Sequence, residues 1–175
     1  MEQKEIFVVT HGRKHGGANP GMTEKGFEEV SSLRNLLPLP IACVVSGTGQ
    51  RHLDVAEALG LTPNRYTAIV GGPESGEAID SDVVNWVRLS DAKLVPGKLV
   101  PYEQYTTLED SALAAQALVV SLPHNSVVCA GRPSMIMFGL VDAKSAAVYR
   151  ILVQDGKIVW TDEVRALGVP EKNAV

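Results

Sequence analysis

The stretch IFVVTHG, residues 6–12, joins a short apolar run to a histidine and a glycine. Its first five residues are apolar or β-branched without alternating polar positions, which predicts a strand buried on both faces, as in a parallel sheet. A side chain directly after such a strand lies at the carboxyl edge of the sheet, where α/β proteins bind their ligands. His11 is therefore the first candidate site residue, and Gly12 after it permits a close backbone approach.

The same kind of apolar run recurs along the chain, and helical patterns separate the runs. Further buried strands are predicted over residues 41–46 and 125–131, with a third candidate over 65–70. Asp155-Gly156 predicts a hairpin turn between two closing strands. Helices are predicted over residues 22–37 with Thr23 as N-cap, 47–60, 106–122 with Thr106 or Thr107 as cap, and from 132 onward with Pro133 in its first turn.

This order of elements predicts a three-layer α/β/α sandwich with a mostly parallel central sheet. Residues 1–175 are expected to form a single domain. The Gly- and Pro-containing segment at about 71–105 is expected to leave the sheet as an excursion on the substrate side, with a short helix near 80–89. The strand ends after Thr10, Ser46 and Ala130 should then meet at one edge.

Composition excludes several classes of function. The net charge of −4, with basic residues spread along the chain, gives no basic stripe for nucleic acid. No apolar run reaches the roughly 18 residues of a membrane span, and the N-terminal residues are unlike a signal peptide, so a cytoplasmic location is expected. Cys43 and Cys129 lie in apolar runs without metal-ligand spacing, which favours buried thiols.

Taken together, three segments resemble the histidine phosphatase superfamily, which includes the cofactor-dependent phosphoglycerate mutases. VVTHG followed by MTEKGFEEV is similar to its opening block, VVSGTGQRHLDVAEALGL to its second block, and the hairpin AAVYRILVQDGKIVW to its closing segment. The resemblance spans residues 6 to about 160. It implies a phosphoglycerate mutase-like fold and phosphoryl transfer without metal or cofactor.

The resemblance also implies roles for single residues. His11 matches the family's nucleophile, which takes up the phosphoryl group, and Arg51 matches an arginine that binds the phosphoryl oxygens at a helix start. A neutral imidazole attacks in line, and cationic donors stabilise the charge on the transferring oxygens. The plainer alternatives are a loop histidine and a solvated surface arginine.

Two expected residues of the phosphate pocket are replaced. Thr10 stands where the family has an arginine before the nucleophile, and Ala130 stands where its second histidine belongs. Losing one preorganised donor commonly slows a reaction about 10²- to 10³-fold, so turnover should be weak unless other residues compensate. Residues near the expected pocket could replace the missing donors. They are Arg13 with its neighbours Lys14 and His15 in the first loop, and Arg132 after the fourth predicted strand. His124 should lie at the opposite edge of the sheet.

The acid that protonates the leaving group is expected in the segment GGPESGEAID. Glu77 is the preferred catalytic candidate and Glu74 the second, although surface carboxylates are common in loops. Trp86, Tyr102 and Tyr105 either line the substrate side or pack the excursion onto the sheet.

Two functions therefore stay open. The first is a divergent phosphatase that weakly hydrolyses a phosphomonoester through phospho-His11, and the second is a non-catalytic module that binds a phosphorylated ligand or has a regulatory role. A remodelled site for another anionic substrate is the third alternative. A small phosphorylated or other anionic ligand is expected in each case, bound by a monomer or a homodimer.

Overall fold

The computed structural model describes residues 2–16, 19–71, 109–140 and 143–169. The expected excursion, its helix at 80–89 and the predicted caps of the helix at 106–122 lie outside the described residues, apart from Gly71. The acid candidates Glu77 and Glu74, with Trp86, Tyr102 and Tyr105, lie outside them as well.

Six strands form one central sheet in the order β3-β2-β4-β1-β5-β6. Strands β1, β2, β3 and β4 are parallel, and β5 and β6 add to β1 as an antiparallel hairpin. The mostly parallel sheet and its closing hairpin are thus as predicted. The bounds are β1 Gln3–Val9, β2 Val44–Ser46, β3 Arg65–Tyr66, β4 Ser126–Cys129, β5 Ala147–Gln154 and β6 Lys157–Ala166.

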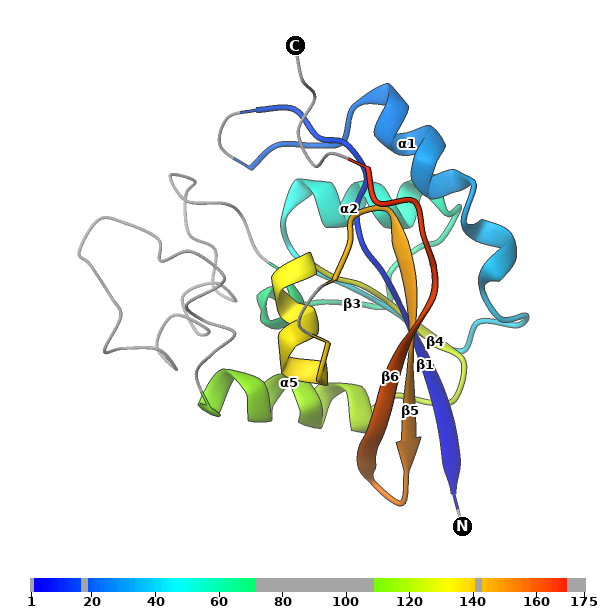
Figure 1. Cartoon of the computed structure of the whole chain (residues 1–175), viewed down its shortest axis with the longest axis vertical. Coiled ribbons are helices and arrows are strands. Elements are labelled where there is room, and N and C mark those ends of the chain that lie inside the picture. The colour runs from blue at the N-terminus through cyan, green and yellow to red at the C-terminus, as the bar shows by residue number, and fades with distance from the viewer. Residues whose placement is uncertain (1, 17–18, 72–108, 141–142, 170–175) are drawn as a thin grey trace, which may run out of the picture.

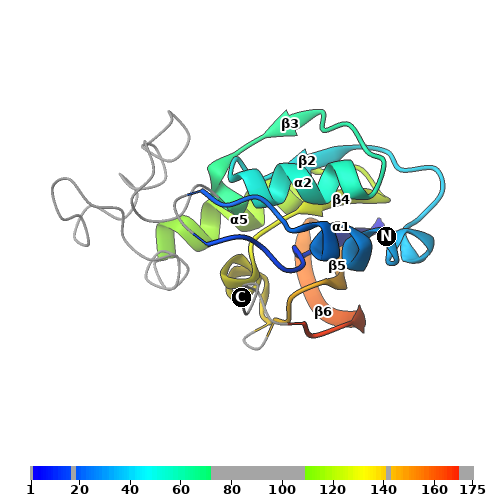
Figure 2. The same cartoon turned by 90° about the horizontal axis from the view of Figure 1, so that it is seen from above.

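Helices cover both faces of the sheet, as Figures 1 and 2 show. On one face lie α1 (Glu24–Ser31) and α2 (Gln50–Ala58), and on the other lie α5 (Glu109–Ser121) and the 3-10 helix η4 (Arg132–Phe138). Two more 3-10 turns, η1 (Arg34–Leu36) and η2 (Ala68–Val70), join these elements. The predicted three-layer sandwich is confirmed.

The alternation of β1 explains the two cores. Ile6 and Val8 pack with α5 and η4, while Phe7 and Val9 pack with α1 and α2. Successive side chains of a strand point to opposite faces, so a strand that is apolar throughout can serve two layers. β1 is therefore apolar without interruption because both of its faces are covered by helices, as its sequence predicted.

Several predicted elements differ from the structure. The helix expected over residues 22–37 ends at Ser31, with η1 after it, and the strand expected over residues 41–46 is limited to β2. The strand expected over residues 65–70 is limited to β3, and η2 follows it, because the chain turns away after pairing two residues with β2. The helix expected from residue 132 is a 3-10 helix, η4. No helix among the described residues is both long and apolar enough to cross a bilayer.

The carboxyl edge of the sheet positions the candidate site. Since β1, β4 and β2 are parallel neighbours, the residues that follow them lie side by side at this edge. His11 follows β1, Ala130 follows β4 and Gly47 follows β2. His124 precedes β4, and its Nδ1 accepts a hydrogen bond from the Glu5 amide at 3.0 Å, so it lies at the opposite edge as predicted.

Candidate active site

His11 is buried at the end of β1, with its ring held in one orientation. Its Nδ1 lies 2.8 Å from the carbonyl oxygen of Gly12. Because a carbonyl oxygen only accepts hydrogen bonds, Nδ1 carries a proton, and in the neutral ring Nε2 then has the lone pair. The backbone is fixed as well, since the amide of Ala146 donates to the His11 carbonyl at 2.8 Å. This is the tautomer that an Nε2 nucleophile requires.

Gly12 allows the first loop to lie directly on α1. A Cβ at Gly12 would stand 2.8 Å from the carbonyl oxygen of Gly26. The Gly12 amide also donates to Sδ of Met22 at 3.2 Å. Thr23 caps α1, as predicted, by accepting the Gly26 amide at 3.1 Å. The motif MTEKG therefore packs the loop that carries His11 against the helix.

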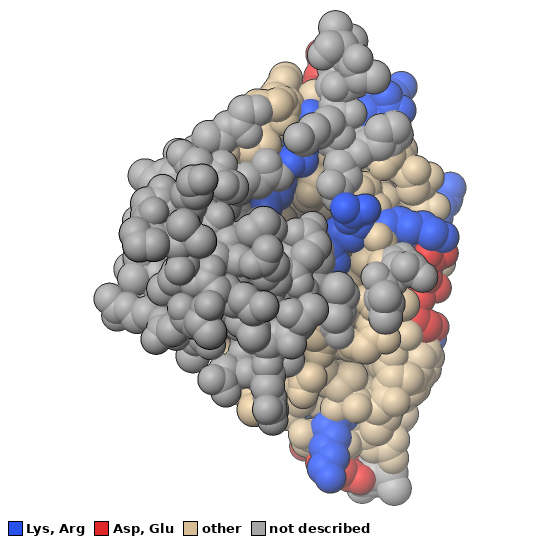
Figure 3. All heavy atoms as spheres, turned by 60° about the vertical axis from the view of Figure 1, so that its left-hand side comes forward, with Lys and Arg blue, Asp and Glu red and all other residues tan. Residues whose placement is uncertain are grey.

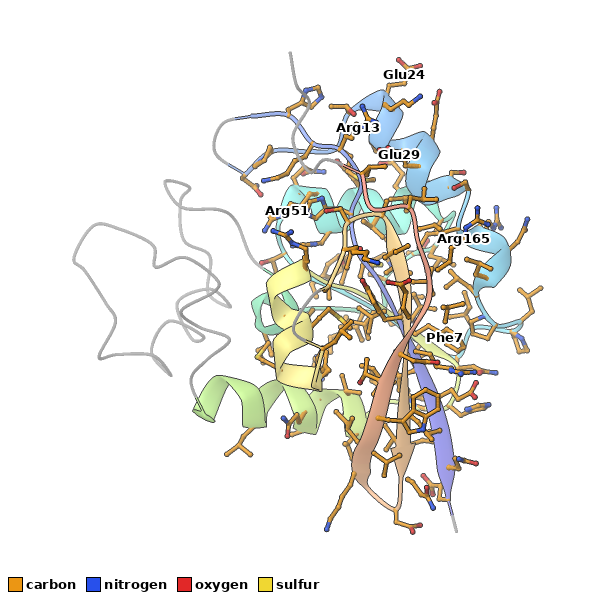
Figure 4. The ribbon with its side chains drawn as sticks, in the orientation of Figure 1. Phe7, Arg13, Glu24, Glu29, Arg51 and Arg165 are labelled. Atoms are coloured by element: carbon orange, nitrogen blue, oxygen red, sulfur yellow. The ribbon has the colours of Figure 1, made fainter. Side chains whose placement is uncertain are left out.

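Arg13, a candidate for substrate binding, is directed toward α1. Its Nε lies 3.1 Å from Oε2 of Glu29, and its backbone amide donates to Oε1 of the same carboxylate at 3.2 Å. Figure 4 shows Arg13 beside Glu29 and apart from Arg51. In the structure Arg13 thus joins the first loop to α1.

Lys14 is the basic residue of this loop that is buried. It is only 2% exposed, and it pairs with Met22 in an antiparallel bridge across the loop. The loop is also fixed to α2, because the Met22 amide donates to Oδ2 of Asp54 at 2.8 Å and the Gln50 amide donates to Oδ1 of Asn19 at 2.8 Å. These contacts hold Lys14 beside the start of α2.

Arg51 lies in the first turn of α2, which follows β2 across a short turn. Its side chain is 3% exposed. Figure 4 places it at the beginning of α2, near the carboxyl edge of the sheet. A guanidinium always carries its charge, so a buried one at this edge is a strong donor toward an oxyanion.

His52 was not predicted as a site residue, yet it lies beside His11. The two ring centroids are 5.9 Å apart and the rings meet edge to face at 60°. His52 is fully buried. Burial, followed by the charges of Arg51, His11 and Lys14, lowers the pKa of His52 well below its usual value of 6.5. Basic groups from the first loop and from α2 therefore converge on this ring.

We expect the buried His52 to make the protein less stable in acid. Its pKa is lowered in the folded state, so below pH 6.5 the unfolded chain binds a proton that the folded protein does not. Stability then rises with pH up to about 6.5, with a slope of up to about 1.4 kcal/mol per pH unit. Urea unfolding at pH 5.5, 6.5 and 7.5 in phosphate-free buffer measures this slope. His52→Leu should have a smaller slope over this range, and an equal slope would contradict the assignment.

Neither Thr10 nor Ala130 offers a side-chain donor to the site. Thr10 is fully buried, and its Oγ1 donates to the Lys144 carbonyl at 2.7 Å and accepts the Ala147 amide at 3.0 Å. The hydroxyl of Thr10 therefore joins β1 to the start of β5. Ala130 is also fully buried and bonds through its backbone amide to the Val9 carbonyl at 3.2 Å.

Arg132 begins η4 and its side chain is exposed. Burial raises the pKa of Tyr149 on β5, and the positive charge of Arg132 is among the influences that oppose this rise. Arg132 therefore lies near the β5 side of the edge.

Within the described ranges, no three His, Cys, Asp or Glu side chains gather as a metal site. Figure 3 shows most of the Lys and Arg atoms of one face in its upper half and a further group at its lower end, with Asp and Glu mainly at its right-hand side.

No protein-family model and no curated protein matches this sequence. Solved structures do match it. The open reading frame Rv3214 from Mycobacterium tuberculosis is 17% identical with a TM-score of 0.58, over 95% of this chain and 97% of that one. TTHB049 from Thermus thermophilus is 14% identical with a TM-score of 0.57, over 90% and 98%. The mycobacterial glucosyl-3-phosphoglycerate phosphatase Rv2419c is 12% identical with a TM-score of 0.56, over 97% and 100%.

This chain has their fold. The overlap covers at least nine-tenths of each chain. The phosphoglycerate mutase-like fold expected from the resemblance is thereby confirmed. At such identities the likeness concerns the fold alone, and the chemistry has to be argued from the residues of this chain.

Proposed function

We propose that this protein is a divergent histidine phosphatase that binds a small phosphomonoester at the carboxyl edge of its sheet and hydrolyses it slowly through His11. The observation that carries the proposal is the 2.8 Å contact of His11 Nδ1 with the Gly12 carbonyl. It leaves the lone pair on Nε2, and nucleophilic catalysis by histidine needs that lone pair. The shared fold with a glucosyl-3-phosphoglycerate phosphatase supports the same reading.

The reaction divides into two displacements at phosphorus. The His11 Nε2 lone pair forms a bond to phosphorus while the phosphorus–ester oxygen bond breaks, and the leaving oxygen takes a proton from a carboxylic acid. Water then attacks the phosphorus of the phosphohistidine and gives its proton to the carboxylate that the first step left. The bond between Nε2 and phosphorus breaks, which releases inorganic phosphate and restores the neutral imidazole and the carboxylic acid. Glu77, with Glu74 as the second choice, stays the predicted acid.

Two buried cations would stabilise the negative charge on the phosphoryl oxygens in both steps. Arg51 at the start of α2 and Lys14 in the first loop are each almost fully buried at this edge. Charges fixed in a buried site stabilise developing oxyanions more than charges in water do. Arg132, exposed at the start of η4, stays a candidate for binding the remainder of the substrate, whereas the Arg13–Glu29 ion pair gives Arg13 a structural role.

A binding module without turnover is the second candidate function. The observation in its favour is that the side chains of Thr10 and Ala130 contribute no donor, and Thr10 is committed to β5. Such a protein would keep the anion pocket but stabilise the transition state too weakly for hydrolysis.

Steady-state assays with a panel of phosphomonoesters, p-nitrophenyl phosphate included, test the proposal. We expect slow turnover in the wild type, loss below detection in His11→Ala, and a decrease of about 10²- to 10³-fold in kcat/KM for Arg51→Ala. His124→Gln is the matched control, since His124 lies at the opposite edge of the sheet and should leave the rate unchanged. Acid-labile, alkali-stable phosphorylation that is lost in His11→Ala would identify the intermediate.

The outcomes separate the two functions. Turnover that persists in His11→Ala would contradict the proposed mechanism. Phosphate binding that depends on Arg51, without any turnover, would favour the binding module. Neither turnover nor phosphate binding would overturn the assignment of an anion site.

A further inference from the structure

His52 combines full burial with an unmet capacity for hydrogen bonding. Neither Nδ1 nor Nε2 has a hydrogen-bond partner among the described residues. Buried polar side chains in native proteins are seldom left in this state, and the exceptions commonly mark a site for a ligand or a catalytic role. The ring is neutral, so one nitrogen is a donor and the other an acceptor.

The ring lies above the carboxyl end of β4. A Cβ at Gly47, which follows β2, would stand 2.8 Å from Cδ2 of His52, while the His11 ring after β1 is 5.9 Å away. Since β4 lies between β2 and β1, a ring that reaches from Gly47 toward His11 crosses the end of β4. Ala130, which is fully buried, follows β4 there.

A second glycine, Gly71, lies next to Gly47 and also borders the ring. A Cβ at Gly71 would stand 2.4 Å from Nε2 of His52. No side chain could occupy that position without moving the imidazole. The sequence therefore keeps glycine at both positions that border the ring.

The charged side chains that act on His52 within the described residues are donors. Arg51 and Lys14 carry only donors, and Nδ1 of His11 already donates to Gly12. These donors would match a negatively charged group with several acceptor oxygens. A phosphoryl group has these properties. A second donor residue or a cation would not match these donors.

We propose that His52 is a phosphoryl-binding residue and fills the place of the family's second histidine, from α2 rather than from the end of β4. The proposal rests on the proposed function, since it assigns a further ligand to the same anion site. His52 would donate a hydrogen bond to an oxygen of the phosphoryl group that His11 attacks. Ala130, at the end of β4, has no side-chain donor of its own for this oxygen.

Binding should also change the protonation of His52. The positive charges of Arg51 and Lys14, together with that of His11 when it is protonated, oppose a charge on the His52 ring. A bound phosphate dianion reverses the sign of the local field, so it favours the imidazolium. Phosphate binding is therefore expected to be coupled to proton uptake by His52.

Calorimetric titration of the full chain with inorganic phosphate tests the assignment. We expect His52→Leu to weaken binding at least 10-fold while the protein stays as stable as the wild type or becomes more stable, because leucine has a similar volume and no polar atom to satisfy. If His52 had only a structural role, its substitution would not weaken phosphate binding while leaving the protein as stable as the wild type. His52→Gln provides a second variant if leucine disturbs the packing, and His124→Gln is the control that should bind like the wild type.

Imidazole NMR on the wild type tests the proposal without relying on a variant's fold. The chain contains four histidines, so spectra of His11→Gln, His15→Gln and His124→Gln assign the fourth, His52, by elimination. We expect neutral His52 signals without phosphate, and an upward shift of their titration when phosphate is added.

The outcomes distinguish this inference from the proposed function. If Arg51→Ala loses phosphate binding but His52→Leu binds normally, and the His52 signals do not respond to phosphate, the inference is overturned and the proposed function stands. If the wild type binds no phosphate at all, both are overturned. Reduced affinity in His52→Leu together with a phosphate-dependent His52 titration supports the inference.

Discussion

Gly26→Ala is expected to lower the free energy of unfolding by about 3 kcal/mol or more. A Cβ at this position would stand 2.2 Å from the Arg13 carbonyl oxygen and 3.0 Å from the Arg13 amide nitrogen, both of them backbone atoms. Backbone cannot turn aside as a flexible side chain can, so α1 and the first loop would have to separate. Alanine's helix propensity would return only about 1 kcal/mol. Urea unfolding followed by circular dichroism measures the change.

Gly16→Ala is the matched control, because a Cβ at Gly16 would meet no atom within 4 Å. The same substitution should be neutral there, or stabilise by about 0.5 kcal/mol through the unfolded chain. Since His11, Arg13 and Lys14 share the loop that Gly26 supports, Gly26→Ala should also weaken phosphate binding. Equal stability of the two variants would show that the loop does not pack on α1 as described.

Thr10→Val is expected to destabilise the protein by about 3 kcal/mol, although the two side chains have nearly the same shape. The hydroxyl of Thr10 bridges two backbone groups, the Lys144 carbonyl and the Ala147 amide. Valine has no hydroxyl, so the Lys144 carbonyl and the Ala147 amide would each lose this hydrogen bond inside the protein. Each loss should lower the free energy of unfolding by about 1–3 kcal/mol. Chemical unfolding at pH 7.5 tests this value.

Thr10→Ser keeps the hydroxyl and removes one methyl group, so it should cost only about 1 kcal/mol. The pair of variants separates the hydrogen bonds from the packing. Should valine be tolerated as well as serine, the bridge to β5 would not contribute to stability. The expected result would give Thr10 a structural role, which is to join β1 to the start of β5.

The fold was predictable because its strongest signals are local. The unbroken apolar runs at β1, β2 and β4 and the Asp155-Gly156 turn indicate their structures without tertiary information. Residues 65–70 did not form the full predicted strand, because only two of them find a partner in β2. The length of an edge strand depends on its neighbour, which the local sequence does not show.

The site was less predictable, because its side-chain directions follow from packing. Arg13 and Lys14 are adjacent in a bridged loop, so they point to opposite sides, and the pairing of Lys14 with Met22 decides which of them is buried. His52 could have been found by spacing. It lies three and seven positions before Val55 and Leu59, on the apolar stripe of α2, which indicates a buried histidine. Its contact with His11 could not be predicted from this spacing, because the tertiary fold brings the two residues together.

The place of β1 in the sheet has a consequence for how this protein is made. Ile6 pairs with Ser126 on one side and with Ile151 on the other, so both neighbours of β1 come from far along the chain. Loop closure on this scale makes folding slow, and it postpones the pairing of β1 until β4, and then β5, has been synthesised. Before β4 is made, this apolar strand has two open edges, which is a risk for aggregation. The segment that carries the candidate nucleophile therefore leaves the ribosome before either of its neighbours in the sheet.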